Sequence, residues 1–451
     1  MRQSGPANGE QVWAMRNVDL HPSRQFFLGV VISAVLIVLK GFVESGEFGK
    51  QLEQMTYNLL QLRLLSRGSS VDLPVAIVDI TDVAATAVEY GGKSEFITPR
   101  GPLGDIVQAI AEQQPRAIGI DLDFSPGEHG YLTASDPDLL RSFLEIRRRG
   151  IPVYVGIFDS VVLDPARWLG RPDFTPLAAY ITVPAPEHTE PSIRMVEWVQ
   201  PKGVSAACYS LAYLLAETRH TPVPLPLRWA VRRATVRQEN EFAASEFLVD
   251  FGSLDSLVSQ RLIAGTADAV TRHGTQLKDR IVLVGRASPG RTTDQFNVPG
   301  RGVPLPGVYL HAAATYTLLQ APLYRLTHGG RIAADALTAL LAFGPVALVG
   351  ARVRRGGRSP ATAHRLHLAL TAVVVVAVLL VGQVLVHRIR LIWTDYLMVI
   401  GALLLHAPIE RQFGRAIQWS RGALRGRLVR RHTPDAEDDE EPIRRQDSEE
   451  A

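Results

Sequence analysis

The stretch Arg116-Ala-Ile-Gly-Ile-Asp-Leu122 is a short, continuous apolar run that directly follows Pro115. A run of this length and composition predicts a β-strand that is buried on both faces, as strands of a parallel sheet are. Two similar runs, residues 73–80 and 151–157, lie before and after it. The sequence therefore predicts three buried strands in this part of the chain.

Helices are predicted between these strands. Residues 101–113 place Leu103, Ile106, Val107 and Ile110 at helical spacing, and residues 136–149 are also expected to be helical. Strands and helices that alternate across short joints are typical of a mostly parallel sheet covered by helices. The fold class is therefore predicted to be α/β. Further predicted elements are strands at residues 246–251 and 279–285 and helices at residues 254–264 and 308–319.

Four apolar runs of about membrane length flank this region, one before it and three after it. They are residues 26–43, 332–350, 366–386 and 391–409. A transmembrane helix needs about 20 apolar residues, so we expect four transmembrane helices. The first run could instead be a cleaved signal peptide, but no small-x-small cleavage pattern follows it, which favours an uncleaved anchor.

The arginines predict the orientation of these spans, because short segments rich in Arg and Lys stay in the cytoplasm. Residues 1–25 hold three arginines, the loop 351–365 holds five and residues 410–451 begin with seven, whereas the loop 387–390 has only Arg388 and Arg390. We therefore expect both termini to be cytoplasmic and residues 44–331 to form an extracytoplasmic domain. The expected location is the bacterial inner membrane.

The overall charge gives no indication of nucleic acid binding. The formal net charge is only +3, and the arginines concentrate beside the predicted spans, where they would contact anionic membrane lipids. Residues 435–451 carry nine acidic residues and almost no apolar ones, so we expect this tail to be disordered. The single cysteine, Cys208, lies in a helical apolar pattern and is expected to be a buried thiol.

Several charged residues follow the predicted strands. The carboxyl ends of parallel strands form the edge where ligands usually bind. Two arginines near this edge could bind a small anion or pair with the aspartates there, and pairing is the favoured interpretation. The candidate ligand-binding residues are Asp79, Asp82, Arg100, Asp121, Asp123, Arg286 and Asp294.

The same aspartates could hold a divalent cation, but aspartate is also common at helix caps and turns. We therefore assign no metal and no cofactor. Phosphate-binding loops, His-Glu-x-x-His and Gly-x-Ser-x-Gly motifs are all missing from the sequence, so no catalytic residue is assigned and the protein is not expected to be an enzyme. His311 opens an apolar helix and is interpreted as a packing residue or cap.

Blocks of sequence in a fixed order resemble the CHASE domains of type 2. The most specific block is residues 277–288, followed by Asp294, Pro299 and residues 306–312; upstream blocks are residues 78–82, 98–100, 117–121 and 124–125, then Asp136. The resemblance covers about residues 45–325 and continues into the three closing spans. Members of this family are extracellular sensory domains associated with cyclases and histidine kinases.

The resemblance implies that an unknown small extracytoplasmic ligand is sensed and that the spans relay the signal inward. Residues 410–451 are too few and too polar for a catalytic output domain, so we expect the output to pass to a separate cytoplasmic signalling protein. A homodimer would fit receptors of this design. Two alternatives are a structural scaffold or anchor of an envelope complex, and a metal-dependent extracytoplasmic hydrolase that uses Asp79, Asp82, Asp121 and Asp123.

Overall fold

The structure is a computed structural model of the whole chain. It describes residues 73–337 apart from 128–129, 159–161, 163, 165–174, 184–193, 218–229, 239, 293, 300–301 and 321–322. It also describes residues 360–385 and the single positions or short segments 35, 51, 55, 57, 388 and 390–392. One compact unit comprises residues 39–337 with 375–398 and contains the α/β domain; a second comprises residues 1–38, 338–374 and 399–451.

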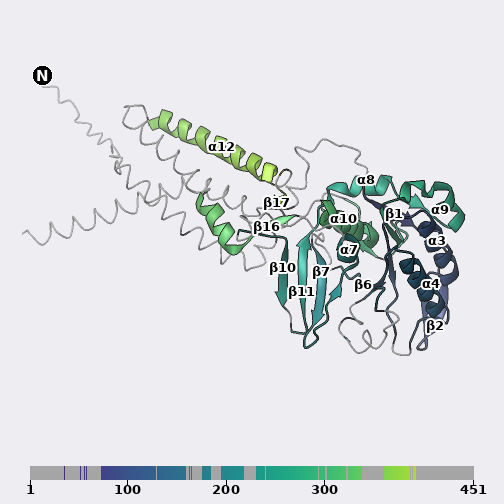
Figure 1. Cartoon of the computed structure of the whole chain (residues 1–451). Helices are drawn as coiled ribbons and strands as arrows, with labels where there is room; N and C mark the ends of the chain where they lie inside the picture. The colour runs from purple at the N-terminus through teal and green to yellow at the C-terminus, as the bar shows by residue number, and fades with distance from the viewer. Residues whose placement is uncertain are drawn as a thin grey trace, which may run out of the picture. The chain divides into compact units, whose positions relative to one another are not determined.

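A six-stranded sheet forms the centre of the α/β domain, and all its neighbouring strands are parallel (Figure 1). In spatial order the strands are β12 (Leu262–Ile263), β1 (Val75–Asp79), β13 (Ile281–Gly285), β4 (Ala117–Asp123), β5 (Val153–Ile157) and β6 (Ala178–Tyr180). Every residue of β1, β13 and β6 is buried, as their continuous apolar sequences require. The predicted strands at 73–80, 116–122, 151–157 and 279–285 are thus confirmed.

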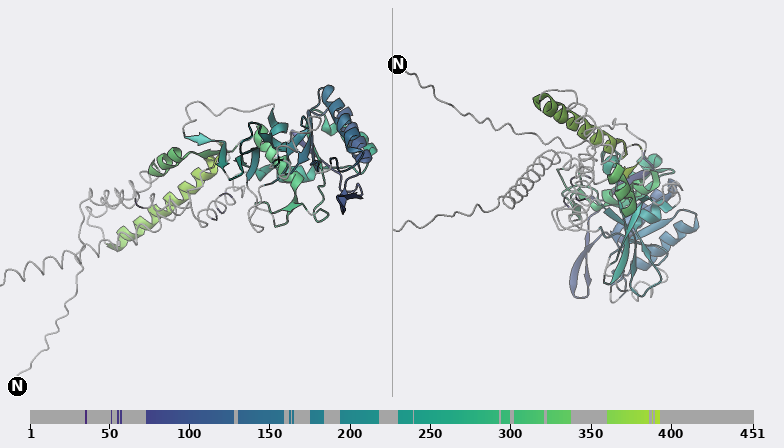
Figure 2. Two further views of the ribbon diagram at one scale, coloured as in Figure 1. Left: turned by 90° about the horizontal axis from the view of Figure 1, so that it is seen from below. Right: turned by 90° about the vertical axis from the view of Figure 1, so that its left-hand side faces the viewer.

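Helices cover both faces of this sheet (Figures 1 and 2). On one side lie α3 (Arg100–Glu112), α4 (Asp136–Arg148) and α9 (Ala267–His273); on the other lie α7 (Leu211–Ala216) and α10 (Gly307–Gln320), with α8 (Leu254–Ser259) against α10. The predicted helices 101–113, 136–149 and 308–319 are confirmed. The predicted helix 254–264 is wrong in its second half, because it ends at Ser259 and residues 262–263 form strand β12.

Two glycines let the helices of the second face approach the sheet closely. A Cβ atom on Gly119 of β4 would lie 2.6 Å from Cδ1 of Leu215 in α7. A Cβ atom on Gly285 of β13 would lie 3.0 Å from Cγ2 of Val308 in α10 and 3.3 Å from Cβ of Asp121. Interiors are close-packed, so α10 reaches the end of the sheet only because β13 ends in glycine.

A second, antiparallel sheet joins the first. Its strands lie in the order β10 (Ala234–Gln238), β11 (Phe242–Leu248), β7 (Arg194–Pro201) and β8 (Cys208–Tyr209), and a bridge between Tyr180 and Ser210 connects it to β6. The strand predicted at 246–251 is the end of β11, so it belongs to this sheet and stops at Leu248. Strands β7, β8 and β10 were not predicted.

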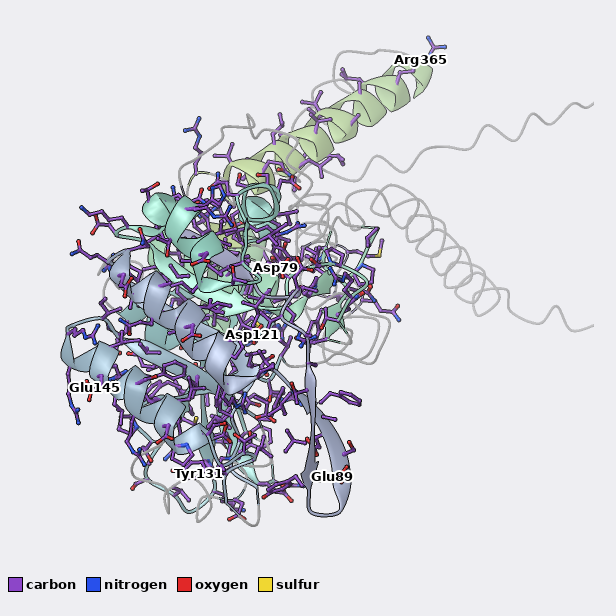
Figure 3. The ribbon with its side chains drawn as sticks, turned by 90° about the vertical axis from the view of Figure 1, so that its right-hand side faces the viewer. Asp79, Glu89, Asp121, Tyr131, Glu145 and Arg365 are labelled. Atoms are coloured by element: carbon purple, nitrogen blue, oxygen red, sulfur yellow. The ribbon has the colours of Figure 1, made fainter. Side chains whose placement is uncertain are left out.

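Several short elements were not predicted. The hairpin of β2 (Thr86–Tyr90) and β3 (Lys93–Ile97) projects from the domain, with Glu89 marking it in Figure 3. Its turn uses Gly91 and Gly92 at φ 58° and 76°, values that glycine adopts without strain. The remaining short elements are β14 (Gln295–Phe296), β15 (Leu305–Pro306), η3 (Phe251–Ser253) and η4 (Gly274–Leu277).

The region around the predicted spans differs from expectation in two places. Strand β16 (Tyr324–Leu326) pairs with β9 (Val231–Arg232) and with β17 (Leu391–Ile392). Strand β16 was not predicted and lies between α10 and the second apolar run. The fourth run was expected to be helical from Leu391, but its first two residues form β17. The pairing of β17 with β16 gives residues 391–392 a strand conformation, although their hydropathy predicts a helix.

The helix α12 (Pro360–Val384) covers most of the third predicted span, and residues 328–337 are helical at the start of the second. Within the described part of the chain, no helix combines the length and hydropathy that a membrane crossing requires. The segments 1–25 and 410–451, and most or all of residues 26–43, 338–350, 351–359 and 393–409, lie outside the described residues.

Candidate functional site

Asp121 lies near the carboxyl end of β4, and its side chain is only 7% exposed. Its Oδ1 lies 3.6 Å from Nε2 of His311 in α10. Burial raises the pKa of Asp121 to about 7, because a carboxylate in an apolar interior loses its hydration. The side chain is therefore a neutral acid in mildly acidic medium and a carboxylate in alkaline medium.

His311 is almost completely buried in α10, and only one of its ring nitrogens has a partner. Nε2 lies 3.1 Å from the carbonyl oxygen of Ile181, so the neutral ring donates its hydrogen there. Nδ1 is buried and has no hydrogen-bond partner among the described residues. Burial lowers the pKa of His311 to about 4, against the opposing influence of Asp294 and of the Ile181 carbonyl. The imidazole is therefore neutral at physiological pH.

Asp294 is the exposed member of the group and precedes β14. Its carboxyl lies over Gly307, at the start of α10, where any β-carbon would collide with it. Partial burial of the carboxyl and the negative charge of Asp121 raise the pKa of Asp294 to about 6, while His311 and the Gly307 N–H act in the opposite direction. We refer to Asp121, Asp294 and His311 together as the acid–histidine cluster.

The charge of the acid–histidine cluster depends strongly on pH. Between about pH 4 and pH 6 all three groups are neutral, so the 3.6 Å approach of Asp121 to His311 is not an ion pair. Above about pH 7 both carboxyls are ionised while the ring stays neutral. Two negative charges then share one site, and these groups titrate as a coupled set.

Asp79 lies at the end of β1, apart from the acid–histidine cluster, and both of its carboxylate oxygens accept hydrogen bonds. Its carboxylate accepts hydrogen bonds from the Thr81 N–H and hydroxyl, from the Ala287 N–H at 2.9 Å and from the Ser288 hydroxyl at 2.8 Å. Burial alone would raise the pKa of Asp79, but these hydrogen bonds outweigh it and hold the pKa below its ordinary value. Asp79 therefore ties the end of β1 to the loop that follows β13.

Arg100 pairs with an aspartate, as expected, but with one that was not among the candidates. Its Nε lies 2.6 Å from Oδ1 of Asp136 at the start of α4, and both side chains are almost fully buried. The guanidinium also lies over the Phe124 ring, 4.3 Å from its centroid. Asp123 instead accepts a hydrogen bond of 2.7 Å from the Ser125 N–H.

The remaining two candidates lie at the surface or near it. Asp82 forms an exposed ion pair with Arg291 at 2.7 Å. Arg286 is partly buried, and the structure gives it no hydrogen-bond or ion-pair partner within the described residues. The seven predicted residues therefore do not form one site. Asp121 and Asp294 come together around His311, and Asp123 lies near enough to Arg100 for that charge to oppose the burial that raises its pKa.

The irregular pairing of β4 explains why Asp121 and Asp123 lie apart. Successive side chains of a strand point to opposite faces of the sheet, and Asp121 and Asp123 are two apart, so a regular strand would place them on one face. The pairing of β4 with β5 is irregular between Ile120 and Asp123, however, which redirects Asp123 toward the side of Arg100. The sequence contains no sign of this irregularity.

A family comparison identifies the family of this chain. A family model for the CHASE2 domain matches residues 30–350, which is well over half of the chain. The chain belongs to the CHASE2 family. This confirms the resemblance carried by residues 277–288 and the upstream blocks. No curated protein and no solved structure matches the chain at a significant level.

CHASE2 domains are extracellular sensory domains, which is consistent with a sensor role for this chain. Within the described residues of this CHASE2 domain, no group of three or more His, Cys, Asp or Glu side chains is arranged to hold a metal ion. The chemistry that the acid–histidine cluster does support is the gain and loss of protons. His311 was the residue that sequence reasoning undervalued; the only signal for it was a single ionisable side chain in an otherwise apolar helix.

Proposed function

We propose that this CHASE2 protein is a non-enzymatic, multipass sensor of the bacterial inner membrane. Its α/β domain, residues 44–331, would face the outside, and its signal would reach a separate cytoplasmic signalling protein. The observation that carries this proposal is the CHASE2 match over residues 30–350, which includes the domain and reaches into the apolar runs on both sides. The arginines beside those runs support the orientation.

Contacts at the base of the domain support a relay between the domain and the flanking segments. Asp250 follows β11, and its Oδ2 accepts a hydrogen bond of 2.6 Å from Nη2 of Arg390, in the loop after α12. The Tyr57 hydroxyl, from the segment after the first apolar run, donates to the carbonyl oxygen of Val249. Tyr57, from near the start of the domain, and Arg390, from beyond its end, thus bind two adjacent residues, and we name Tyr57, Asp250 and Arg390 the basal node.

The helix α10 connects the basal node to the ligand edge of the sheet. The Asp250 N–H donates to the Thr317 hydroxyl at 2.8 Å, and that hydroxyl donates to the Ala313 carbonyl at 2.7 Å. The same helix carries His311 of the acid–histidine cluster. A displacement of α10 at the cluster would therefore act on Asp250, and through it on Arg390. A packed helix with a discrete contact at each end is a suitable relay element.

Residues 410–451 are the proposed output surface. They contain seven arginines over residues 411–431 and nine acidic residues over residues 435–451, so a basic stretch of sequence is followed by an acidic one. Charge complementarity speeds association and selects partners. The proposed partner is a cytoplasmic signalling protein that binds this segment.

Site-specific crosslinking in cells tests this proposal. A photoreactive residue at position 415 of the full-length chain is expected to capture a cytoplasmic signalling protein, whereas the same residue at the exposed position 89 of β2 is expected to capture none. Arg390→Met should change the yield at position 415 through the basal node. The proposal is contradicted if position 415 captures no cytoplasmic protein and deletion of the chain leaves signalling unaffected.

A further inference from the structure

We infer that the acid–histidine cluster is a proton-binding site and that the proton of the external medium is a ligand of this sensor. The signalling part of the inference rests on the proposed function. Proton binding itself depends only on the α/β domain. Uptake forms one O–H bond on a carboxylate oxygen of Asp121, with the proton supplied by the medium, and no other covalent bond changes.

The geometry separates the cluster into a buried part and an exposed part. Asp121 and His311 are shielded from solvent and lie 3.6 Å apart, while Asp294 is exposed and lies over the first residue of α10. His311 also presents a buried ring nitrogen that has no hydrogen-bond partner in the described part of the chain. A buried acceptor of this kind is rare in folded proteins and marks a place where a donor can bind. Asp294 gives the buried groups a connection to the external medium.

The electrostatics of the three groups strengthen the inference. Burial moves the pKa of Asp121 to about 7, so that the carboxyl changes its charge near neutral pH instead of near pH 4. The negative charge of Asp121 raises the pKa of Asp294, and the interaction is reciprocal. This repulsion separates the two ionisations, so the cluster becomes doubly negative only after the pH has risen through both values, about 6 and about 7.

Other ionisable groups on the elements packed around α10 are accounted for by other contacts. Asp79 of β1 accepts the hydrogen bonds described above, and Arg261 lies 3.6 Å from it and 3.5 Å from the Tyr309 hydroxyl. Tyr213 of α7 interacts with Glu197, Arg233, Tyr209 and Glu217. Asp255 of α8 is exposed, and β13 and β15 contain no ionisable side chain. The charge of the cluster is therefore set mainly by its own three members.

Ionisation of the cluster would act on α10. His311 and the Gly307 start of the helix both belong to α10, while Asp121 belongs to the sheet. The buried Asp121 carboxylate is repelled by the Asp294 carboxylate over the helix start and draws in water, which favours separation of the helix from the sheet. Val308 packs closely against Gly285, so there is little space for water to enter or for the carboxylates to move apart unless α10 moves. The alkaline state would therefore have a displaced α10.

Infrared difference spectroscopy between pH 8 and pH 5 tests the site in the full-length protein in detergent. In this range Asp294 also becomes protonated, with a midpoint near pH 6, whereas ordinary Asp and Glu have pKa values of about 4 and do not. The wild-type chain is expected to gain the C=O band of a buried carboxylic acid, with a midpoint near pH 7. Asp121→Asn should lose the band with its midpoint near pH 7 and keep only the band of Asp294, whose midpoint falls below pH 6, and Asp105→Asn, on the exposed face of α3, should keep both.

If Asp121→Asn does not fold, a second variant still tests the proton-binding site. Asp294→Asn retains the Asp121 carboxyl but removes the neighbouring negative charge, so the band should remain and its midpoint should move to lower pH. An absent wild-type band near pH 7, or a band that keeps its midpoint near pH 7 in folded Asp121→Asn, overturns the proton site even if position 415 still captures a partner. A titrating band without any capture at position 415 overturns the sensor proposal and leaves the proton site standing.

Discussion

Ionising Asp121 costs solvation energy because its carboxyl is buried against His311. Its pKa in the folded chain, about 7, lies above the ordinary value of 3.8. A raised pKa contributes stability that is fully present below the unfolded pKa and is lost as the pH rises through the folded pKa. Between pH 5 and pH 7 this loss amounts to about 2 kcal/mol.

Asp121→Asn removes this dependence, because the amide has no charge at any pH. Relative to wild type, the variant is expected to gain about 3 kcal/mol of unfolding free energy between pH 5 and pH 8. Thermal unfolding of the full-length protein in detergent at the two pH values measures this. A difference between variant and wild type that is the same at both pH values would disprove the assignment of a raised pKa to Asp121.

The Arg100–Asp136 pair offers a prediction with a control on the same helix. Asp136→Ala leaves the Arg100 guanidinium buried without its counterion and should lower the unfolding free energy by about 3–5 kcal/mol. Asp138→Ala removes the exposed pair with Arg141, two residues further along α4, and should change it by less than about 1 kcal/mol. Similar unfolding temperatures for the two variants would contradict the buried role of Asp136.

At the level of single residues, the sequence located charges at the sheet edge but not their partners. Asp79 and Asp121 follow predicted strands, and the structure places both there (Figure 3). Partners such as His311 and Ser288 lie about 190–210 positions away in the chain, and only the packing of α10 and of the loop after β13 brings them near. No local pattern could have paired them.

The pairing of β16 with β17 depends on few interactions, because each strand is only two or three residues long. Arg390 stabilises the pair twice: its carbonyl accepts the Tyr324 N–H at 2.7 Å, and its guanidinium binds Asp250. Arg390→Met should therefore increase hydrogen exchange of residues 324–326 by roughly tenfold, corresponding to the loss of about 1–2 kcal/mol of local stability.

Arg388→Met is the matched control, because Arg388 is exposed and lies two residues from Arg390. Mass spectrometry of peptides that contain β16 and β17 would resolve the two variants. Equal exchange in Arg390→Met and Arg388→Met would show that the ion pair with Asp250 does not hold β17 in place. That result would also remove the basal node from the proposed relay.

Among the helices and strands, the long elements of the parallel sheet and its covering helices were easier to predict from the sequence than the short ones. The five- to seven-residue strands β1, β4, β5 and β13 and the helices of thirteen or fourteen residues were predicted from their apolar patterns, whereas the eight-residue β7 was not. Two-residue strands such as β12 and β17 carry no periodicity and exist only through pairing with distant neighbours. The β2–β3 hairpin is exposed and so lacks an apolar face, although its Gly91-Gly92 turn was a usable signal.

For the whole molecule, the account requires the α/β domain on one side of the membrane and residues 410–451 on the other. An external stimulus can reach the acid–histidine cluster only in that arrangement, and a cytoplasmic partner can read the charged segment only then. The native cysteine does not interfere with a thiol-labelling test, because Cys208 is buried and burial raises its pKa to about 12. Single cysteines can therefore be introduced into the otherwise natural chain.

The most direct measurement is labelling with a membrane-impermeant thiol reagent added from the extracytoplasmic side of intact inner membranes. Glu89→Cys, in the exposed hairpin, is predicted to react before the membrane is permeabilised, and Arg415→Cys only afterwards. The unchanged chain serves as the control and should not react. Reaction of Arg415→Cys before permeabilisation, or of Glu89→Cys only after it, would contradict the proposed sensor.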